Sequence, residues 1–203
     1  MIRIAIVAGS TRPSRRARLV AEWVAKVAAR DDTVTTGAAM FEIVDLVDYR
    51  LPLLDEPAPA AIGDYSRDHT RSWAEKIASF DGFVFVTPEY NHSMPAALKN
   101  AIDFLFSEWN DKAAGFVSYG LNDGVRAVEA LRLSLAEVKI ACVRSQVALS
   151  LFGDFIITDM TEPGQLAPRE HHEALCHRML GELTTWARAL TPLREHTSTP
   201  APM

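Results

Sequence analysis

The feature that most constrains the fold of this chain is a regular alternation of short apolar runs with longer segments of helical periodicity. Four runs are almost continuously apolar, which is typical of buried strands in a parallel sheet. They cover residues 2–8, 82–87, 115–118 and 143–151. A fifth run, residues 41–47, alternates apolar with acidic residues and is typical of a strand nearer a sheet edge. The sequence therefore predicts five strands.

Each predicted strand is followed by a segment whose apolar residues recur every three or four positions, as in Val20, Val24 and Val27. This spacing puts the apolar side chains on one face of a helix. The four later helices are predicted over residues 67–80, 93–107, 125–138 and 169–190. Residues 48–63 and 152–168 contain prolines and little periodicity, so we predict loops there.

Strands that alternate with helices imply a parallel sheet covered on both faces. Five such units fit the flavodoxin-like strand order 2-1-3-4-5, with a ligand site at the carboxyl ends of strands 1 and 3. We therefore expect an α/β, flavodoxin-like three-layer sandwich that forms a single domain over residues 1–190. Residues 191–203 are predicted to be a partly disordered tail.

Composition excludes several classes of protein. The chain of 203 residues has a formal net charge of −5, which argues against a nucleic-acid binder. The apolar N-terminal run is too short for a signal peptide, and no stretch reaches the length of a membrane span. We therefore expect a cytoplasmic protein without a membrane partner. The two cysteines show no disulfide or zinc spacing and are expected to be neutral thiols.

The loop after the first strand includes two adjacent hydroxyl side chains and three arginines before a helix begins. They are Ser10, Thr11, Arg12, Arg15 and Arg16. A helix N-terminus offers backbone N–H groups to an anion, and guanidinium groups suit phosphate. Cations at a helix N-terminus are unfavourable unless an anion compensates them. The loop lacks the P-loop lysine and the three-glycine dinucleotide pattern, so the sequence favours a monophosphate.

Two further loops follow strands 3 and 4, and a flavodoxin-like fold would bring both to the same crevice. The first runs from Thr87 to Pro95, and its Tyr90 and His92 are candidates to flank a planar ring. Ser93 is a candidate cap of the helix that follows. The second loop runs from residue 118 to 124, and its glycines permit close backbone approach.

No carboxylate pair, catalytic triad or metal-ligand cluster is visible, and we assign no catalytic side chain and no metal. His171, His172 and His177 are expected to lie on a solvated helix face.

The three loops together resemble those of the NADPH-dependent FMN reductase family. Gly9-Ser-Thr-Arg-Pro13, the long motif from Thr87 to Asp103, and Ser118-Tyr-Gly120 match that family in order and spacing. The resemblance implies that Ser10, Arg12 and Arg16, with Thr11 beside them, hold the phosphate of FMN. It implies that Pro88, Glu89, Tyr90, Asn91 and His92 line the isoalloxazine ring, which Ser118, Tyr119 and Gly120 close on its other side.

The function implied is an NAD(P)H-dependent flavin oxidoreductase with FMN as cofactor and NADPH or NADH as co-substrate. Electrons would pass in a ping-pong sequence through FMN to a small-molecule acceptor such as free flavin or quinone. One alternative is a flavodoxin-like electron carrier that does not oxidise a nicotinamide. Another is a regulatory or structural protein that keeps the fold and uses no flavin.

The resemblance also implies a homodimer, or a tetramer. The helix predicted over residues 93–107 is more apolar than packing on the sheet requires, and Phe104 and Trp109 lie outside its apolar stripe. Aromatic residues are favoured in interface cores, so we expect a partner subunit to dock along this helix. The alternative is that the proline-rich loop of residues 48–63 covers the same surface.

Overall fold

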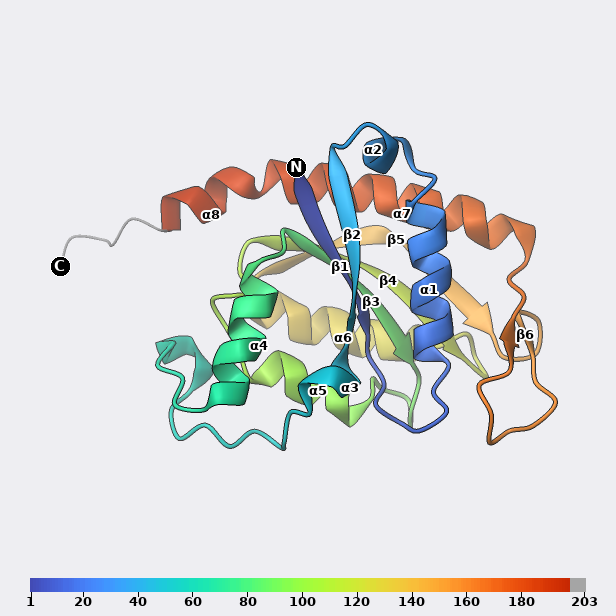
Figure 1. Cartoon of the computed structure of the whole chain (residues 1–203), viewed down its shortest axis with the longest axis horizontal. Coiled ribbons are helices and arrows are strands. Elements are labelled where there is room, and N and C mark those ends of the chain that lie inside the picture. Colours follow the sequence, from blue (N-terminus) through green and yellow to red (C-terminus); the bar gives the residue numbers. More distant parts are fainter. Residues whose placement is uncertain (198–203) are drawn as a thin grey trace.

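The computed structural model describes residues 1–197. Five parallel strands form one sheet in the order β2-β1-β3-β4-β5 (Figure 1), which confirms the predicted flavodoxin-like fold. The strands are β1 (Ile2–Ala8), β2 (Ala39–Asp45), β3 (Gly82–Pro88), β4 (Lys112–Gly120) and β5 (Ile140–Ser150).

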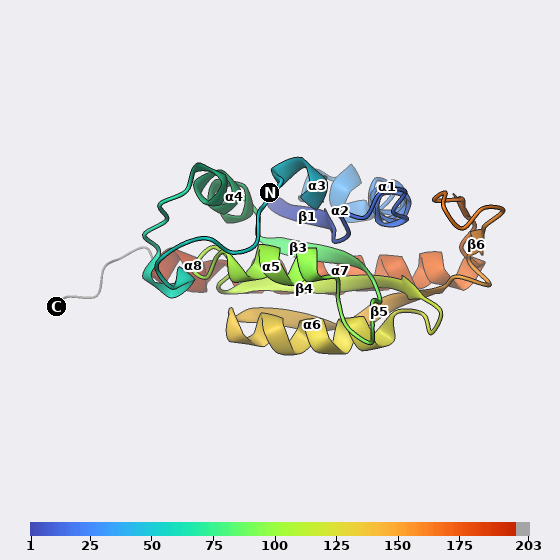
Figure 2. The ribbon, with the colours of Figure 1, turned by 90° about the horizontal axis from the view of Figure 1, so that it is seen from below.

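Helices cover both faces of this sheet (Figure 2). One face packs against α1 (Ala17–Ala28) and α7 (Glu170–Ala189), and the other against α4 (Asp68–Ala78), α5 (Ala96–Asp103) and α6 (Val125–Glu137). Short elements fill the connections: α2 (Asp32–Thr35), α3 (Leu46–Tyr49), the 3-10 turn η1 (Ala60–Ile62), β6 (Phe155–Ile156) and β7 (Gln165–Leu166). Every residue of β3 and β4 is buried, as expected for the centre of a doubly covered sheet.

Phe104 and Trp109, which we expected at a subunit interface, belong instead to the chain's own core. Phe104 is 0% and Trp109 is 1% exposed. The Trp109 ring lies 4.9 Å from the ring of Phe83, and its Nε1 donates to the carbonyl oxygen of Ile102. The stated reason for a dimer along this helix is therefore wrong, because helical periodicity does not reveal what the residues after the helix pack against.

The proline-rich loop lies along α5, as the alternative supposed. Asn100 holds it with both ends of its amide, donating to the carbonyl oxygen of Pro52 and accepting from the backbone N–H of Leu54. Tyr65, just beyond the loop, donates to Glu108 at 2.8 Å. These contacts cover part of the surface on which we expected a partner subunit to dock.

Several predicted boundaries differ from the observed ones, and two of them differ for identifiable local reasons. The strand predicted over residues 41–47 ends at Asp45, because its carboxylate accepts from the backbone N–H of Val47 and caps α3. The helix predicted from Ser93 begins at Ala96, because Ser93 is paired with Tyr90 across a tight turn.

The last described element is α8 (Thr191–Thr197), which continues the line of α7 along the top of Figure 1. The prediction of disorder concerned the end of the chain, and residues 198–203 lie outside the described residues. Across residues 1–197 no helix combines the length and apolar character that crossing a bilayer requires.

Candidate active site

The loops after β1, β3 and β4 meet at one edge of the sheet and enclose a cavity of about 210 Å³. Seven of the predicted site residues line it: Arg12, Arg16, Pro88, Glu89, Tyr90, Tyr119 and Gly120. Its remaining lining residues are Ser14, Arg15, Leu121 and Leu151. Leu151 follows β5, so the rule that ligands bind at strand carboxyl ends would have found it; no sequence signal singled out Ser14.

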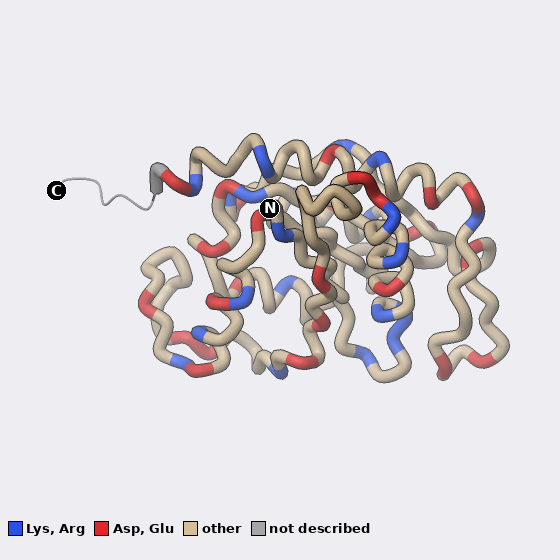
Figure 3. Tube along the Cα trace, turned by 45° about the horizontal axis from the view of Figure 1, so that its top comes forward, with Lys and Arg blue, Asp and Glu red and all other residues tan. Residues whose placement is uncertain are grey.

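The arginine side of the cavity has unused hydrogen-bond donors. Arg16 is 8% exposed; its Nη2 donates to the carbonyl oxygen of Glu162 at 3.0 Å, and its Nε is buried without a partner. Arg15 pairs with the buried Asp45 at 2.5 Å, and its Nε is likewise buried and unpaired. Buried donors without acceptors are costly. Figure 3 shows the basic positions gathered along the loop after β1 and the start of α1, so this side suits an anion.

Ser10 and Thr11 do not line the cavity. Ser10 is fully buried, its Oγ lies 3.0 Å from the phenol oxygen of Tyr90, and it accepts from the backbone N–H of Arg12 at 3.4 Å. Its side chain thus joins the loop after β1 to the loop after β3. Thr11 faces a separate cavity of about 270 Å³ between this loop, α3 and α5.

The loop after β3 makes a tight turn between Tyr90 and Ser93, whose backbones exchange two hydrogen bonds of 2.9 and 3.0 Å. Asn91 and His92 occupy its tip with φ angles of 50° and 67°. This left-handed conformation is uncommon for residues other than glycine, although asparagine and histidine adopt it more often than most. Both side chains are exposed and neither lines the cavity, so the turn places Tyr90 against the cavity and turns Asn91 and His92 away.

Glu89 lines the cavity, but its carboxylate is directed to the start of α6. It accepts from the backbone N–H of Arg126 at 3.2 Å and from Arg126 Nε at 2.6 Å, and Nη2 of the same guanidinium completes the ion pair. No side chain of α6 itself caps the helix, which begins after Gly124. Glu89 therefore caps α6 from another loop and compensates a cation in its first turn. Sequence reasoning missed Arg126.

The loop after β4 closes the opposite side. Ser118 is buried, and its hydroxyl donates to the carbonyl oxygen of Asp123 at 2.7 Å, so it shapes the loop and does not line the cavity. Tyr119 is 5% exposed, and burial raises the pKa of its phenol, which therefore stays protonated. At Gly120 a Cβ would lie 3.2 Å from the backbone nitrogen of Gly124, so glycine relieves a close approach within this loop.

Among the histidines of α7, His171 is exposed as expected, but His172 does not lie on a solvated face, which corrects the sequence expectation for that residue. His172 is 3% exposed, and its Nε2 lies 3.2 Å from the buried carboxylate of Asp154. Burial lowers the pKa of His172. His177 approaches Asp31 at 3.5 Å. Within residues 1–197, no three histidine, cysteine, aspartate or glutamate side chains are grouped as metal ligands would be.

Solved structures with the same fold include oxidoreductases. The flavoenzyme FerB of Paracoccus denitrificans, an NAD(P)H:acceptor oxidoreductase, superposes with a TM-score of 0.69 over 93% of this chain and 98% of its own, at 18% identity. This likeness concerns the fold alone.

Sequence relatives are closer. An NAD(P)H-dependent FMN reductase of Schizosaccharomyces pombe is 37% identical over 163 residues, which cover 79% of each chain. A quinone reductase of Pseudomonas putida is 32% identical over 173 residues, which cover 79% of this chain and 87% of that one. The sequence profile of the NADPH-dependent FMN reductases matches residues 2–154. Since that match spans most of the chain and all three cavity loops, the chain belongs to the NADPH-dependent FMN reductase family and is an NAD(P)H-dependent enzyme with FMN as its cofactor.

Proposed function

We propose that the cavity at the ends of β1, β3 and β4 binds FMN, and that the enzyme passes electrons from NAD(P)H to a small-molecule acceptor. The observation that carries this proposal is the pair of buried, unpartnered guanidinium nitrogens, Arg15 Nε and Arg16 Nε, beside a cavity lined on its other side by aromatic rings. A phosphate would supply the missing acceptors, and a planar apolar ring suits Tyr90 and Tyr119. The residues present therefore fit FMN.

In this proposal Arg12 and Arg16 hold the phosphate as charged donors, with the start of α1 behind them. Pro88, Tyr90 and Tyr119 bound the ring, and Gly120 permits its close approach. Ser10 acts on the site through Tyr90, because their hydroxyl groups are 3.0 Å apart. Glu89 acts through Arg126 by fixing the loop after β3 on α6.

When bound, FMN would supply two-electron chemistry between the substrates, so that one hydride from NAD(P)H and one proton from water together convert a quinone to a hydroquinone. The protein's task is positioning, so we assign no general acid. Both substrates would use the same open side of the cavity in turn, and steady-state kinetics would be ping-pong. Membership of a reductase family favours this enzyme over a one-electron carrier.

The acceptor class proposed is a quinone or a free flavin. Support comes from relatives: the Pseudomonas putida protein is named a quinone reductase, and a Burkholderia relative 34% identical over 117 residues is named a 2-hydroxy-1,4-benzoquinone reductase. Leu121 and Leu151 give the cavity an apolar rim that would suit either acceptor.

Flavin titration tests the cofactor site. Arg12→Ala should raise the dissociation constant for FMN by roughly tenfold or more, since a hydrogen bond to a charged group contributes roughly 1.5–3 kcal/mol. Riboflavin, which lacks the phosphate, should bind the variant and the wild type alike. Arg30→Ala, which removes an exposed arginine paired with Glu173, is the matched control. An unchanged FMN affinity in Arg12→Ala would refute the phosphate assignment.

Anaerobic addition of NADPH or NADH to the flavin-loaded protein tests the reaction. Reduction should bleach the flavin absorbance without a partner protein, and a quinone should restore it. A flavin that neither nicotinamide reduces within seconds would favour the carrier.

We also propose a homodimer, now on a different surface from Phe104 and Trp109. A groove between α5 and α6 starts at Tyr90 and Asn91, and Leu133 on its α6 side is 78% exposed. A partner seated there would border the flavin loop. Leu133→Glu should convert a dimer to a monomer in light scattering, and a wild-type monomer at micromolar concentration would refute the proposal.

A further inference from the structure

Residues 152–168, which connect β5 to α7, form a small hairpin that we call the flap. β6 and β7 pair in antiparallel orientation within it. Its turn depends on Gly164, whose φ is 70° and whose Cβ, if present, would lie 2.6 Å from the carbonyl oxygen of Ile156. Figures 1 and 2 show the flap projecting beside the start of α1, next to the loop that carries the arginines.

The flap touches the cofactor site at two points. The carbonyl oxygen of Glu162 accepts from Arg16 Nη2 at 3.0 Å, and the ring of Phe155 lies 5.8 Å from the ring of Tyr119. The first contact holds one end of the Arg16 guanidinium while Nε stays buried and unpaired beside the cavity. A flexible arginine side chain held in this way loses less entropy when it binds an anion.

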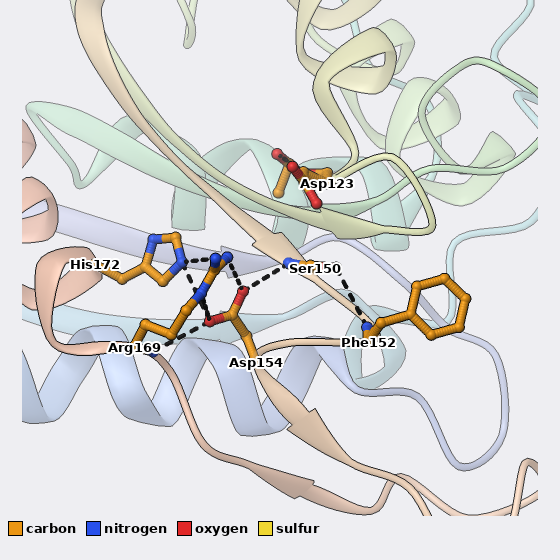
Figure 4. Close-up of polar contacts among 7 residues, drawn as sticks. Asp123, Ser150, Phe152, Asp154, Arg169 and His172 are labelled. Carbon is orange, nitrogen blue, oxygen red and sulfur yellow. Dashed lines mark hydrogen bonds and ion pairs between the residues drawn. The ribbon is translucent and has the colours of Figure 1, made fainter.

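A buried carboxylate closes the base of the flap. Asp154 is fully buried and accepts from the backbone N–H of Ser150 at 2.8 Å, on the strand that enters the flap. It also accepts from the backbone N–H, Nε and Nη2 of Arg169 at 3.1, 3.0 and 3.0 Å, where the chain leaves the flap. His172 Nε2 lies 3.2 Å away (Figure 4). One side chain therefore joins the two ends of the segment, whose Phe155 also packs into the hydrophobic core.

We propose that the flap is a fourth element of the cofactor site, which aims Arg16 at the FMN phosphate, and that Asp154 is the positioning residue that holds the flap in place. This inference rests on the proposed function. Its physical basis is a chain of direct contacts: Asp154 fixes both ends of the flap, the flap presents the Glu162 carbonyl, and that carbonyl orients Arg16. Asp154 itself does not line the cavity.

The route through Arg16 makes a distinctive prediction, because only FMN carries a phosphate. Asp154→Asn should raise the dissociation constant for FMN about tenfold, a loss of ~1.4 kcal/mol, while that for riboflavin changes less than about twofold. Calorimetry or flavin fluorescence measures both constants, so activity is not needed. In this variant a neutral amide replaces the carboxylate among the donors of Arg169. Its thermal unfolding should therefore be measured together with that of the wild type, as a check on folding.

Gly164→Ala tests the same idea without touching the Asp154 cluster, because its Cβ would collide with the backbone of the flap. It should lower the preference for FMN over riboflavin in the same way. Gly37→Ala is the matched control: Gly37 has a φ of 71°, and no atom lies within 4 Å of its added Cβ. This control should lose less conformational stability than Gly164→Ala, because its Cβ meets no backbone, and it should keep the wild-type preference.

The outcomes separate the two proposals. If the wild type binds neither flavin, the proposed function fails and this inference fails with it. If the wild type prefers FMN and both flap variants keep that preference, the flap inference alone is wrong. An equal loss of FMN and riboflavin affinity would also overturn it, since it would show that the flap supports the ring and not Arg16.

Discussion

Substitution of Glu89 by glutamine is the most informative single change to the site. The side chain is close in size to the original, so the cavity keeps its shape while the carboxylate charge disappears. The amide oxygen can still accept from the backbone N–H or from one guanidinium nitrogen of Arg126, but the amide nitrogen then faces donors. The cap of α6 and the anchor of the loop after β3 are weakened together.

The structure sets the size of this effect. The Glu89 side chain is 7% exposed and that of Arg126 is 39% exposed, so solvent screens the pair only in part. A hydrogen bond to a charged group contributes roughly 1.5–3 kcal/mol. The neutral amide loses one or two of the three contacts that the Glu89 carboxylate makes with Arg126. We expect the free energy of unfolding to fall by about 2 kcal/mol. For a chain of this size that corresponds to a fall in Tm of roughly 4–8 °C.

Urea denaturation and flavin titration measure the two consequences. FMN and riboflavin should both bind more weakly, because the loop that borders the ring loses its anchor, whereas Arg12→Ala affects FMN alone. Glu129→Gln, an exposed carboxylate on the same helix, should change stability by less than about 0.5 kcal/mol. A double-mutant cycle with Arg126→Met should give a coupling energy above about 0.5 kcal/mol. The reasoning is refuted if the stability effects of the two substitutions are strictly additive and Glu89→Gln leaves flavin affinity unchanged.

Other predictions concern glycine geometry and pH. Gly124→Ala should destabilise the protein at least twice as much as Gly63→Ala in urea denaturation: both residues have a φ above 70°, but only at Gly124 would a Cβ meet backbone, 2.8 Å from the Tyr119 nitrogen. Equal losses would contradict this. Burial lowers the pKa of Lys112 from 10.5 to about 7. The unfolded chain then binds a proton that the folded chain lacks between pH 7 and 10.5, so this residue makes the free energy of unfolding rise with pH in that window, by at most ~1.4 kcal/mol per pH unit. Lys112→Met should remove that slope, and a variant whose stability between pH 7 and 9 runs parallel to the wild type would rule the explanation out.

The hydrophobic pattern was sufficient to predict the sheet and its ligand edge. Ile2–Ala8 and Gly82–Pro88 are buried on both faces, and such strands are recognisable because nearly every position must be apolar. The carboxyl-end rule then placed the loops carrying Arg12, Tyr90 and Tyr119 together, and all three line one cavity. These features follow from local periodicity and strand direction, which a single sequence contains.

The sequence could not predict which way the side chains of these loops turn. Glu89 was expected at the ring, yet its carboxylate caps α6, because Arg126 and an uncapped helix start lie beside it only after folding. Ser10 was expected at a phosphate, yet its hydroxyl contacts Tyr90, eighty positions along the chain. Such partners come from distant segments, and nothing in the spacing of either loop specifies them.

Burial of the aromatic residues after α5 was also decided by tertiary packing. Phe104 and Trp109 lie outside the apolar stripe of the predicted helix, and from the sequence alone such positions are interpreted as surface. In the structure both residues follow the end of α5 at Asp103 and belong to the same core cluster as residues of α4. Likewise, we expected His172 on a solvated helix face, whereas it is buried beside the carboxylate of Asp154. The sequence by itself determined where strands, helices and site loops occur, because these depend on neighbouring residues. Only the tertiary structure decided which polar groups meet and which apolar groups are covered, because those depend on segments that folding brings together.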